Sequence, residues 1–311
     1  HPVKVDNDEK ILVSDNVYDC YRIFDDLCSL IEHHKPCFLQ FSYLTETFLL
    51  ELIESILNNF TSVFIKHTEM GYLLRFRITP IFLRSLSIPT KEFSVVVRIA
   101  RIVYLLIRKN LQILNIECEI VISLLNHMIL NDLESPIWKK IIVIEIFNGI
   151  FQDFNLVEAI FKEYDYNQDR KHVLNDFLIN SYCLINSAGS KKIMKFRSVL
   201  HPPVSNINRA QSLTATATGS GSSLPNQPSP MVAEFLIDGS PDKITFMDML
   251  DKTNPPDIPD NYVYYLVLSC FNNLVEGIGK YVMNLSISEA DKSTTRKLVK
   301  FLDNPDIIES D

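Results

Sequence analysis

Apolar residues recur every three or four positions over most of the first 186 residues of this chain. In the stretch VYDCYRIFDDLCSLI, the face of one helix would carry Val17, Cys20, Tyr21, Phe24, Leu27, Cys28 and Ile31. This spacing predicts an amphipathic helix with one buried face. The same spacing predicts further helices over residues 47–58, 70–86, 93–109, 116–130, 136–151, 156–162 and 170–185. Pro80 should kink or split the helix predicted over residues 70–86.

The predicted helices are joined by short loops, and some of them, such as residues 141–150, are apolar nearly all round. A helix of that kind belongs to the inner layer of a stack. Glycine is scarce, with 8 residues in the chain, which favours helices over a many-stranded sheet. The pattern therefore predicts an all-α chain, an α-solenoid of stacked antiparallel helices with degenerate repeats. A compact helical bundle is the structural alternative.

The pattern breaks after Ile185 and divides the chain into three parts. Residues 1–186 would form the helical solenoid. Residues 187–243, which include TATATGSGSS and LPNQPSP, have no periodicity and predict a flexible low-complexity linker. Residues 244–311 resume helical patterning, in a helix from Tyr262 to about Met283 and in the tail SISEADKSTTRKLVKFL. We expect this returning segment to pack on the solenoid or to extend it.

Composition and charge restrict the partners and the cellular compartment that we expect for this protein. The formal net charge is −8, which argues against nucleic acid as a partner. Charged residues interrupt each long apolar run, so none offers the roughly 20 apolar residues that a membrane span needs. The six cysteines form no CxxC pair and no signal peptide is recognised, a combination typical of reduced thiols in a cytosolic protein. The chain starts without Met, so we expect a processed protein or a piece of a longer one.

The stretch EYDYNQDRKHVLND, residues 163–176, spaces its oxygen-bearing side chains like a calcium-binding loop. However, a cation stands where such a loop needs Gly, and Asp176 stands where it needs a bidentate Glu. The sequence therefore predicts a junction between helices that holds no metal. There, Asp165 and Asp169 would accept hydrogen bonds from backbone N–H groups at the start of a helix.

A basic stripe is the second candidate site. Residues 66–110 hold 9 bases against 2 acids. On a helix, four of these cations would project within roughly 100° of one another, from the 3.6-residue period. The functional interpretation is docking on an anionic membrane surface or an acidic partner, and the structural alternative is a solvated outer face. The residues of this stripe are Lys91, Arg98, Arg101 and Arg108.

The sequence contains none of the catalytic motifs that we sought. The seven histidines form no HExxH, and neither GxSxG nor a phosphate-binding GxxxxGK motif occurs. The sequence therefore predicts no catalytic residue, no metal ligand and no cofactor. The PxxP spacing within residues 255–259 lacks a cation close on its C-terminal side, so we interpret it as a rigid connector.

A short run of residues within the calcium-like stretch, residues 163–167, resembles a sequence box of a known protein family. It is similar to the box Asn-Tyr/Phe-Asp-Cys-Asp/Asn in the HUS ("homology upstream") region of large Arf guanine-nucleotide exchange factors. Tyr164, Asp165 and Asn167 match that box, whereas Glu163 replaces Asn and Tyr166 replaces Cys. We expect Tyr164 to pack inward, and Tyr166 and Asn167 to lie near the surface.

Four longer stretches of sequence make the family resemblance more specific. They are LELIESILNNF, ECEIVISLL, SPIWKK and MLDKTNPPDIPDNY. Together they resemble the Mon-two (monensin-sensitivity) family, the non-catalytic Golgi and endosome scaffolds related to those exchange factors. The resemblance covers about residues 16–185 and 244–280. It implies an armadillo-like α-solenoid that is not an enzyme and has no exchange activity of its own.

The resemblance also implies partners and a location. The expected partners are a Dopey-type protein, through it a phospholipid flippase, and an Arf-like small GTPase bound through a region N-terminal to or outside this chain. The expected location is cytoplasmic and peripheral, on trans-Golgi network and endosome membranes. Two functional hypotheses follow. One is a non-enzymatic scaffold for endosome-to-Golgi traffic, and the other is a regulatory helical module of an active large Arf exchange factor.

Overall fold

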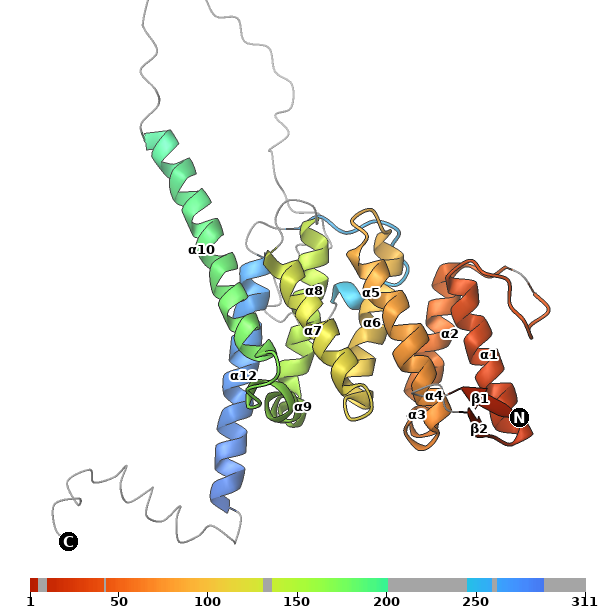
Figure 1. Ribbon diagram of the computed structural model, residues 1–311. Helices are drawn as coiled ribbons and strands as arrows, with labels where there is room; N and C mark the ends of the chain where they lie inside the picture. The colour runs from red at the N-terminus through yellow and green to blue at the C-terminus, as the bar shows by residue number, and fades with distance from the viewer. Residues whose placement is uncertain (5–9, 42, 131–135, 201–244, 259–261, 288–311) are drawn as a thin grey trace, which may run out of the picture.

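Helices dominate the computed structural model, which describes residues 1–4, 10–41, 43–130, 136–200, 245–258 and 262–287 (Figure 1). The all-α fold predicted from the apolar spacing is confirmed. The helices are α1 (Asp15–Ile31), α2 (Glu46–Asn59), α3 (Thr61–Lys66), α4 (Thr68–Leu73), α5 (Thr79–Ser87), α6 (Phe93–Asn110), α7 (Asn115–Leu130), α8 (Ile137–Gln152), α9 (Phe154–Ile160), α10 (Val173–Leu200) and α12 (Tyr262–Ile287). Three shorter helical turns are η2 (Leu74–Ile78), η3 (Phe161–Asp165) and η4 (Phe246–Asp248).

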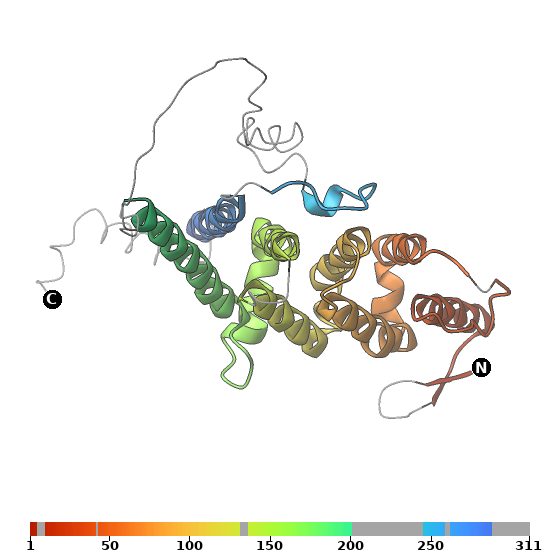
Figure 2. The same cartoon turned by 90° about the horizontal axis from the view of Figure 1, so that it is seen from above.

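The helices stack in two layers, which Figure 2 shows nearly end-on. One layer runs α2, α6, α8 and α12, and each of these helices packs against the next. The other layer runs α1, α4 with α5, α7 and α10. Successive helices therefore pair across the layers, as in the predicted α-solenoid. The N-terminus lies at one end of the stack, and α10 and α12 form the other end (Figure 1).

Helix α8 shows how the layers make the core. It lies between α6 and α12 in its own layer and also contacts α7 in the other layer. Ile141, Ile144, Phe147 and Ile150 are all 0% exposed, although they point in different directions around the helix. Covering on several sides explains why this helix is apolar nearly all round.

Two local features differ from the predicted helices. Residues 70–86 do not form one helix: a π-helical turn, η2, separates α4 from α5. The helical backbone is nevertheless continuous through η2, with αR conformations at Leu74, Ile78 and Thr79, so the chain is not split at Pro80, and a kink there stays a prediction. The chain also starts with a small antiparallel hairpin of β1 (Pro2–Lys4) and β2 (Lys10–Leu12), which the apolar spacing did not predict.

The structure describes only part of the predicted three-part division of the chain. Helix α10 continues to Leu200, well past the predicted start of the linker at residue 187. The rest of that linker, residues 201–243, and the predicted tail helix lie outside the described residues. After the linker, η4 lies against α6 and α8, and α12 packs along α8. Within the described ranges, no helix is long and apolar enough to cross a membrane.

Candidate interaction surfaces

The box at residues 164–167 lies between η3 and α10. Tyr164 is 0% exposed, and its hydroxyl donates a hydrogen bond of 2.6 Å to the Asn115 carbonyl. The Asp165 carboxylate accepts hydrogen bonds from the N–H groups of Leu174 (3.1 Å) and Asn175 (3.0 Å). The predictions that Tyr164 packs inward and that Asp165 accepts N–H groups at a helix start are therefore confirmed.

The remaining box residues face outward, as predicted. Tyr166 is 78% exposed, and Asn167 is exposed as well. Asn167 Oδ1 accepts the N–H of Asp169 at 3.1 Å, so Asn167 is the side-chain acceptor in this turn. The prediction that the Asp169 carboxylate accepts such a bond is wrong, because it accepts none from the residues that the structure describes. Phe161 is 48% exposed, and its ring centroid lies 6.4 Å from that of Tyr166.

Polar contacts tie the box to the start of α7. Glu163 accepts a hydrogen bond of 2.6 Å from Asn115 Nδ2, and Arg170 forms a 2.8 Å ion pair with Glu119. Glu119 also accepts the N–H of Lys171 at 2.9 Å. Burial alone would raise the pKa of Glu119, but the Lys171 N–H and the Arg170 guanidinium outweigh burial and lower that pKa. Arg170, the cation in the calcium-like loop, therefore serves this junction.

Each cation of the predicted basic stripe faces a carboxylate. Arg98 is largely buried, with 8% of its side chain exposed, so the alternative of a solvated outer face is wrong for this residue. Three of the pairs join α2 to α6 or to the loop before it, and they form a ladder between neighbouring helices. Membrane docking by the stripe remains a prediction that these contacts do not test. The N–O pairs are Lys91–Glu46 at 2.7 Å, Arg98–Glu51 at 2.8 Å, Arg101–Glu54 at 2.7 Å and Arg108–Asp153 at 3.8 Å.

A buried glutamate side chain anchors the segment that begins at residue 245. Glu145 on α8 accepts hydrogen bonds from the N–H groups of Phe246 (2.8 Å) and Met247 (3.1 Å). From the other side, Arg101 Nη1 donates to the Met247 carbonyl at 3.2 Å. Burial raises the pKa of Glu145 to about 8, although the two N–H groups oppose that shift. Sequence reasoning missed this anchor, and the only signal was a lone acid inside the apolar run IIVIEIFNGIF.

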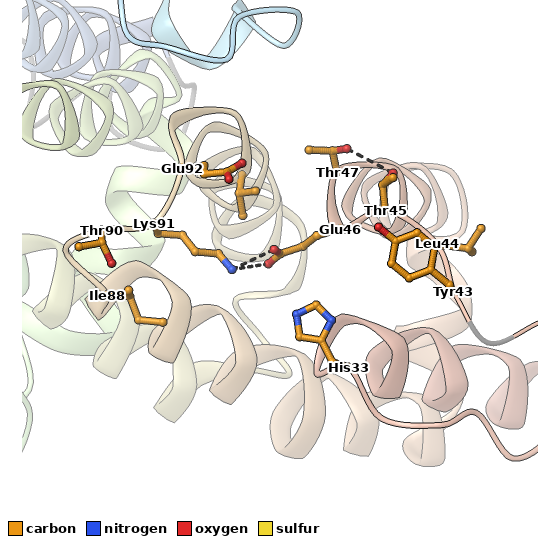
Figure 3. Close-up of a pocket in the computed structure, with 11 residues that line it drawn as sticks. His33, Tyr43, Leu44, Thr45, Glu46, Thr47, Ile88, Thr90, Lys91 and Glu92 are labelled. Carbon is orange, nitrogen blue, oxygen red and sulfur yellow. Dashed lines mark hydrogen bonds and ion pairs between the residues drawn. The ribbon is translucent and has the colours of Figure 1, made fainter.

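A cavity of about 470 Å³ opens between the α1–α2 loop and the α5–α6 loop (Figure 3). His33, Tyr43 and Ile88 lie around it, and the ion pair of Glu46 and Lys91 crosses it. His33 has a φ of 59° at the end of α1. Because Glu46 and Lys91 satisfy one another, the cavity lacks the concentrated charge of an ion site. Among the described residues, no group of three or more His, Cys, Asp or Glu side chains is placed to hold a metal.

Comparison with protein families gives the class of this chain. The Mon2/Sec7/BIG1-like HUS domain matches residues 16–173, which run from the start of α1 to the start of α10. This range is just over half of the chain, and it contains the Tyr164–Asn167 box. The chain belongs to this HUS domain family.

Within the HUS domain family, the relatives that match this chain are of the Mon2 type. The predicted resemblance to the Mon-two family is therefore confirmed. The chain is 30% identical to Protein MON2 of Saccharomyces cerevisiae over 294 residues, which cover 92% of the chain and 16% of the relative. It is 31% identical to the MON2 homolog of Xenopus laevis and 29% identical to that of Homo sapiens, each over 84% of the chain and 17% of the relative. The chain thus spans about a sixth of the length of these relatives. No solved structure gives a significant match.

Proposed function

We propose that this chain is the HUS region of a non-enzymatic scaffold for endosome-to-Golgi membrane traffic. The observation that carries the proposal is the HUS match over residues 16–173, together with relatives that are named MON2. A rigid stack of helices suits a scaffold, because it presents surfaces in a fixed relation without forming a reaction centre. The protein would act in the cytoplasm, peripherally bound to trans-Golgi network and endosome membranes.

The proposed direct partner is a Dopey-type protein, docked at the corner that contains the box. Two exposed aromatic rings, Phe161 and Tyr166, lie side by side there. Buried contacts behind them hold the backbone, since Tyr164 is fully enclosed and Asp165 holds the start of α10. Exposed aromatic rings on a rigid support are typical of residues that dominate binding energy.

Two further partners complete the proposal. A phospholipid flippase would be reached indirectly, through the Dopey-type protein. An Arf-like small GTPase would bind through a region N-terminal to or outside residues 1–311. An anionic membrane surface is a candidate contact for the basic stripe, although the ion pairs of Arg98 and Arg101 place those cations against α2.

Capture from cytosol tests the partner assignment. The immobilised chain should retain the Dopey-type protein, identified by mass spectrometry. Replacing Phe161 and Tyr166 together by Ala should reduce capture by about tenfold or more, the loss expected for aromatic hot spots. Tyr43→Ala is the matched control, because Tyr43 is 75% exposed in the α1–α2 loop, at the other end of the stack. Equal losses for both variants would contradict docking at the box corner.

The alternative is a regulatory helical module of an active large Arf exchange factor. The family description favours this candidate, because it also covers Sec7-like and BIG1-like proteins. Nucleotide release from an Arf-type GTPase separates the two functions. The scaffold proposal expects the full-length protein to leave the release rate unchanged, and a marked acceleration would establish the alternative.

A further inference from the structure

The loop between α1 and α2, residues 32–45, carries an exposed aromatic surface. Its apolar residues divide into an inner and an outer set. Pro36 is buried, and Leu39 and Leu44 are partly buried against the hydrophobic core, so these residues anchor the loop. Grouped exposed rings mark an interaction surface, whereas exposed apolar residues scattered singly need no explanation. The outer set consists of Phe38, which is 39% exposed, Phe41, which is 45% exposed, and Tyr43, which is 75% exposed.

Contacts with α1 hold the backbone that carries the first of these rings. Asp26 accepts the N–H of Phe38 at 2.6 Å and that of Leu39 at 2.7 Å. The guanidinium carbon of Arg22 lies 4.7 Å from the centroid of the Phe38 ring. The loop projects from the end of the stack that α1 and α2 form (Figure 1). The loop is therefore placed to meet a broad surface at that end of the stack.

The charge of this loop has one sign at its exposed positions. Residues 33–45 contain no Asp or Glu, although residues 1–54 hold 11 acids against 4 bases. The acids at the two ends of the loop form ion pairs with other segments, Glu32 with Arg77 at 3.2 Å and Glu46 with Lys91 at 2.7 Å. The exposed side chains that carry or can gain a positive charge are Lys35, His33 and His34. The loop thus combines exposed aromatic rings with cationic groups and no acid of its own between them.

This combination favours a lipid bilayer as the occupant. Aromatic side chains are favoured where the hydrocarbon layer meets the headgroups, and tyrosine has an apolar ring with a polar tip that suits this boundary. A cation near the bilayer surface adds attraction to anionic lipids. The basic stripe is less suited to the same contact, because Arg98 and Arg101 pair with carboxylates on α2.

We infer that the α1–α2 loop docks this protein on anionic membranes. Phe38, Phe41 and Tyr43 would enter the headgroup layer, and Lys35 would lie toward the anionic headgroups. The Phe161–Tyr166 corner is at the other end of the stack, so it stays accessible to a protein partner (Figure 1). This inference rests on the proposed peripheral membrane location and does not depend on the Dopey-type partner.

Vesicle flotation of the purified chain tests the inference. The vesicles consist of phosphatidylcholine, either alone or mixed with phosphatidylserine. Phe41→Ser with Tyr43→Ser removes two rings from the loop. Phe161→Ser with Tyr166→Ser is the matched control, because it removes the same two residue types at similar exposures, 48% and 78%, from the other end of the stack. Urea unfolding establishes that both double variants are folded.

The wild type should bind vesicles that contain phosphatidylserine and should bind phosphatidylcholine vesicles more weakly. This preference should decrease as salt is added, because salt screens the attraction between the loop and the lipids. The loop variant should bind the phosphatidylserine vesicles about tenfold or more weakly, since two rings no longer leave water on docking. The control variant should bind as the wild type does.

Absence of vesicle binding by the wild type would overturn the inference, and so would equal binding by the wild type and the loop variant. Equal losses for the two double variants would overturn it as well, because the loss would then not be specific to the loop. If the loop variant instead lost a protein captured from cytosol and kept its vesicle binding, the rings would belong to a protein interface and the inference would be wrong. Vesicle binding is measured without other proteins, so its failure leaves the capture test of the Dopey-type partner unaffected.

Discussion

At the scale of single residues, three acidic side chains accept hydrogen bonds from backbone N–H groups of segments that follow them in the chain. Asp26 is 3% exposed and accepts the N–H groups of the α1–α2 loop, those of Cys37, Phe38 and Leu39, at 2.6 to 2.7 Å. Asp165 accepts N–H groups in the first turn of α10, and Glu145 accepts those of Phe246 and Met247. Each carboxylate therefore satisfies at least two backbone donors, and its removal leaves those donors without their acceptor.

The first prediction concerns Asp165. Asp165→Ala should lower the free energy of unfolding by about 0.5–2 kcal/mol, the cost of losing the side chain that accepts the N–H groups of Leu174 and Asn175 at the start of α10. Asp169→Ala is the matched control: this carboxylate is exposed, so its loss should change stability by no more than about 0.5 kcal/mol. Urea unfolding followed by circular dichroism measures both variants. Equal stabilities for the two variants would refute the structural role of Asp165.

The second prediction concerns the pH dependence that Glu145 imposes. Its pKa rises from an ordinary 4.5 to about 8 in the folded protein, mainly through burial. Stability from a raised pKa is complete below the unfolded value and is lost as pH rises through the folded value. The wild type should therefore lose stability relative to Glu145→Gln, which does not titrate, between about pH 4.5 and 8. The change is at most about 1.4 kcal/mol per pH unit for one proton.

Urea unfolding at several pH values measures this difference between wild type and Glu145→Gln. Taking the difference removes the titration of the histidines, which both proteins share. A difference that stays constant, or that grows in favour of the wild type as pH rises, would show that Glu145 is not held in an environment that disfavours its charge.

At the scale of elements, the packing of α12 depends on a close approach at Gly277. A Cβ atom at residue 277 would lie 2.9 Å from Phe154 Cδ2 on α9, whereas a Cβ at Gly279 would meet nothing within 4 Å. The third prediction is that Gly277→Ala lowers the free energy of unfolding by about 1 kcal/mol or more through overpacking. Gly279→Ala should instead be neutral or stabilising by up to about 1 kcal/mol, from helix propensity.

Thermal unfolding of the two alanine variants checks this pair. Both changes add the same methyl group to the same helix, two residues apart, so propensity contributes equally to each. If Gly277→Ala were as stable as Gly279→Ala, the contact between α12 and α9 would not be as close as the structure places it.

The elements also show how much of the fold the sequence could predict. Local apolar spacing was sufficient for α1, α2, α6, α7 and α8, because each of them buries a face of helical period. It was not sufficient for the π-helical turn η2, which contacts α1, α4 and α5. Nor did it predict the β1–β2 hairpin, whose three-residue strands are too short to show an alternating pattern.

The candidate sites also differ in how far the sequence could predict them. The role of Asp165 was predictable, because its donors, Leu174 and Asn175, lie only nine and ten residues further along the chain. The inward direction of Tyr164 was predicted too, but its hydrogen bond to the Asn115 carbonyl, 49 residues away, was not. The Glu145 anchor was not predictable, because its two donors lie about a hundred residues further along the chain. The basic stripe was recognised as a row of cations. Its pairing with acids on α2 depends on the packing of two helices that are far apart in sequence.

At the scale of the whole molecule, two layers of helices continue on both sides of the long stretch between Leu200 and Ile244. Helix α10 ends one layer, and α12, which follows that stretch in sequence, takes the corresponding place in the other layer. The segment before α12 is held by Glu145 and Arg101. The scaffold proposal therefore expects the binding surface at the box corner to depend on the stack, which supports it from behind.

The central claim is that this stack is a scaffold which presents the Phe161–Tyr166 corner to a Dopey-type partner. The most direct test is equilibrium binding between the purified chain and the purified partner, measured for wild type, for Phe161→Ala with Tyr166→Ala, and for Tyr43→Ala. The account predicts saturable binding that the double change weakens by about tenfold or more and that Tyr43→Ala leaves unchanged. Absence of saturable binding by the wild type, or an affinity that the double change does not alter, would contradict it.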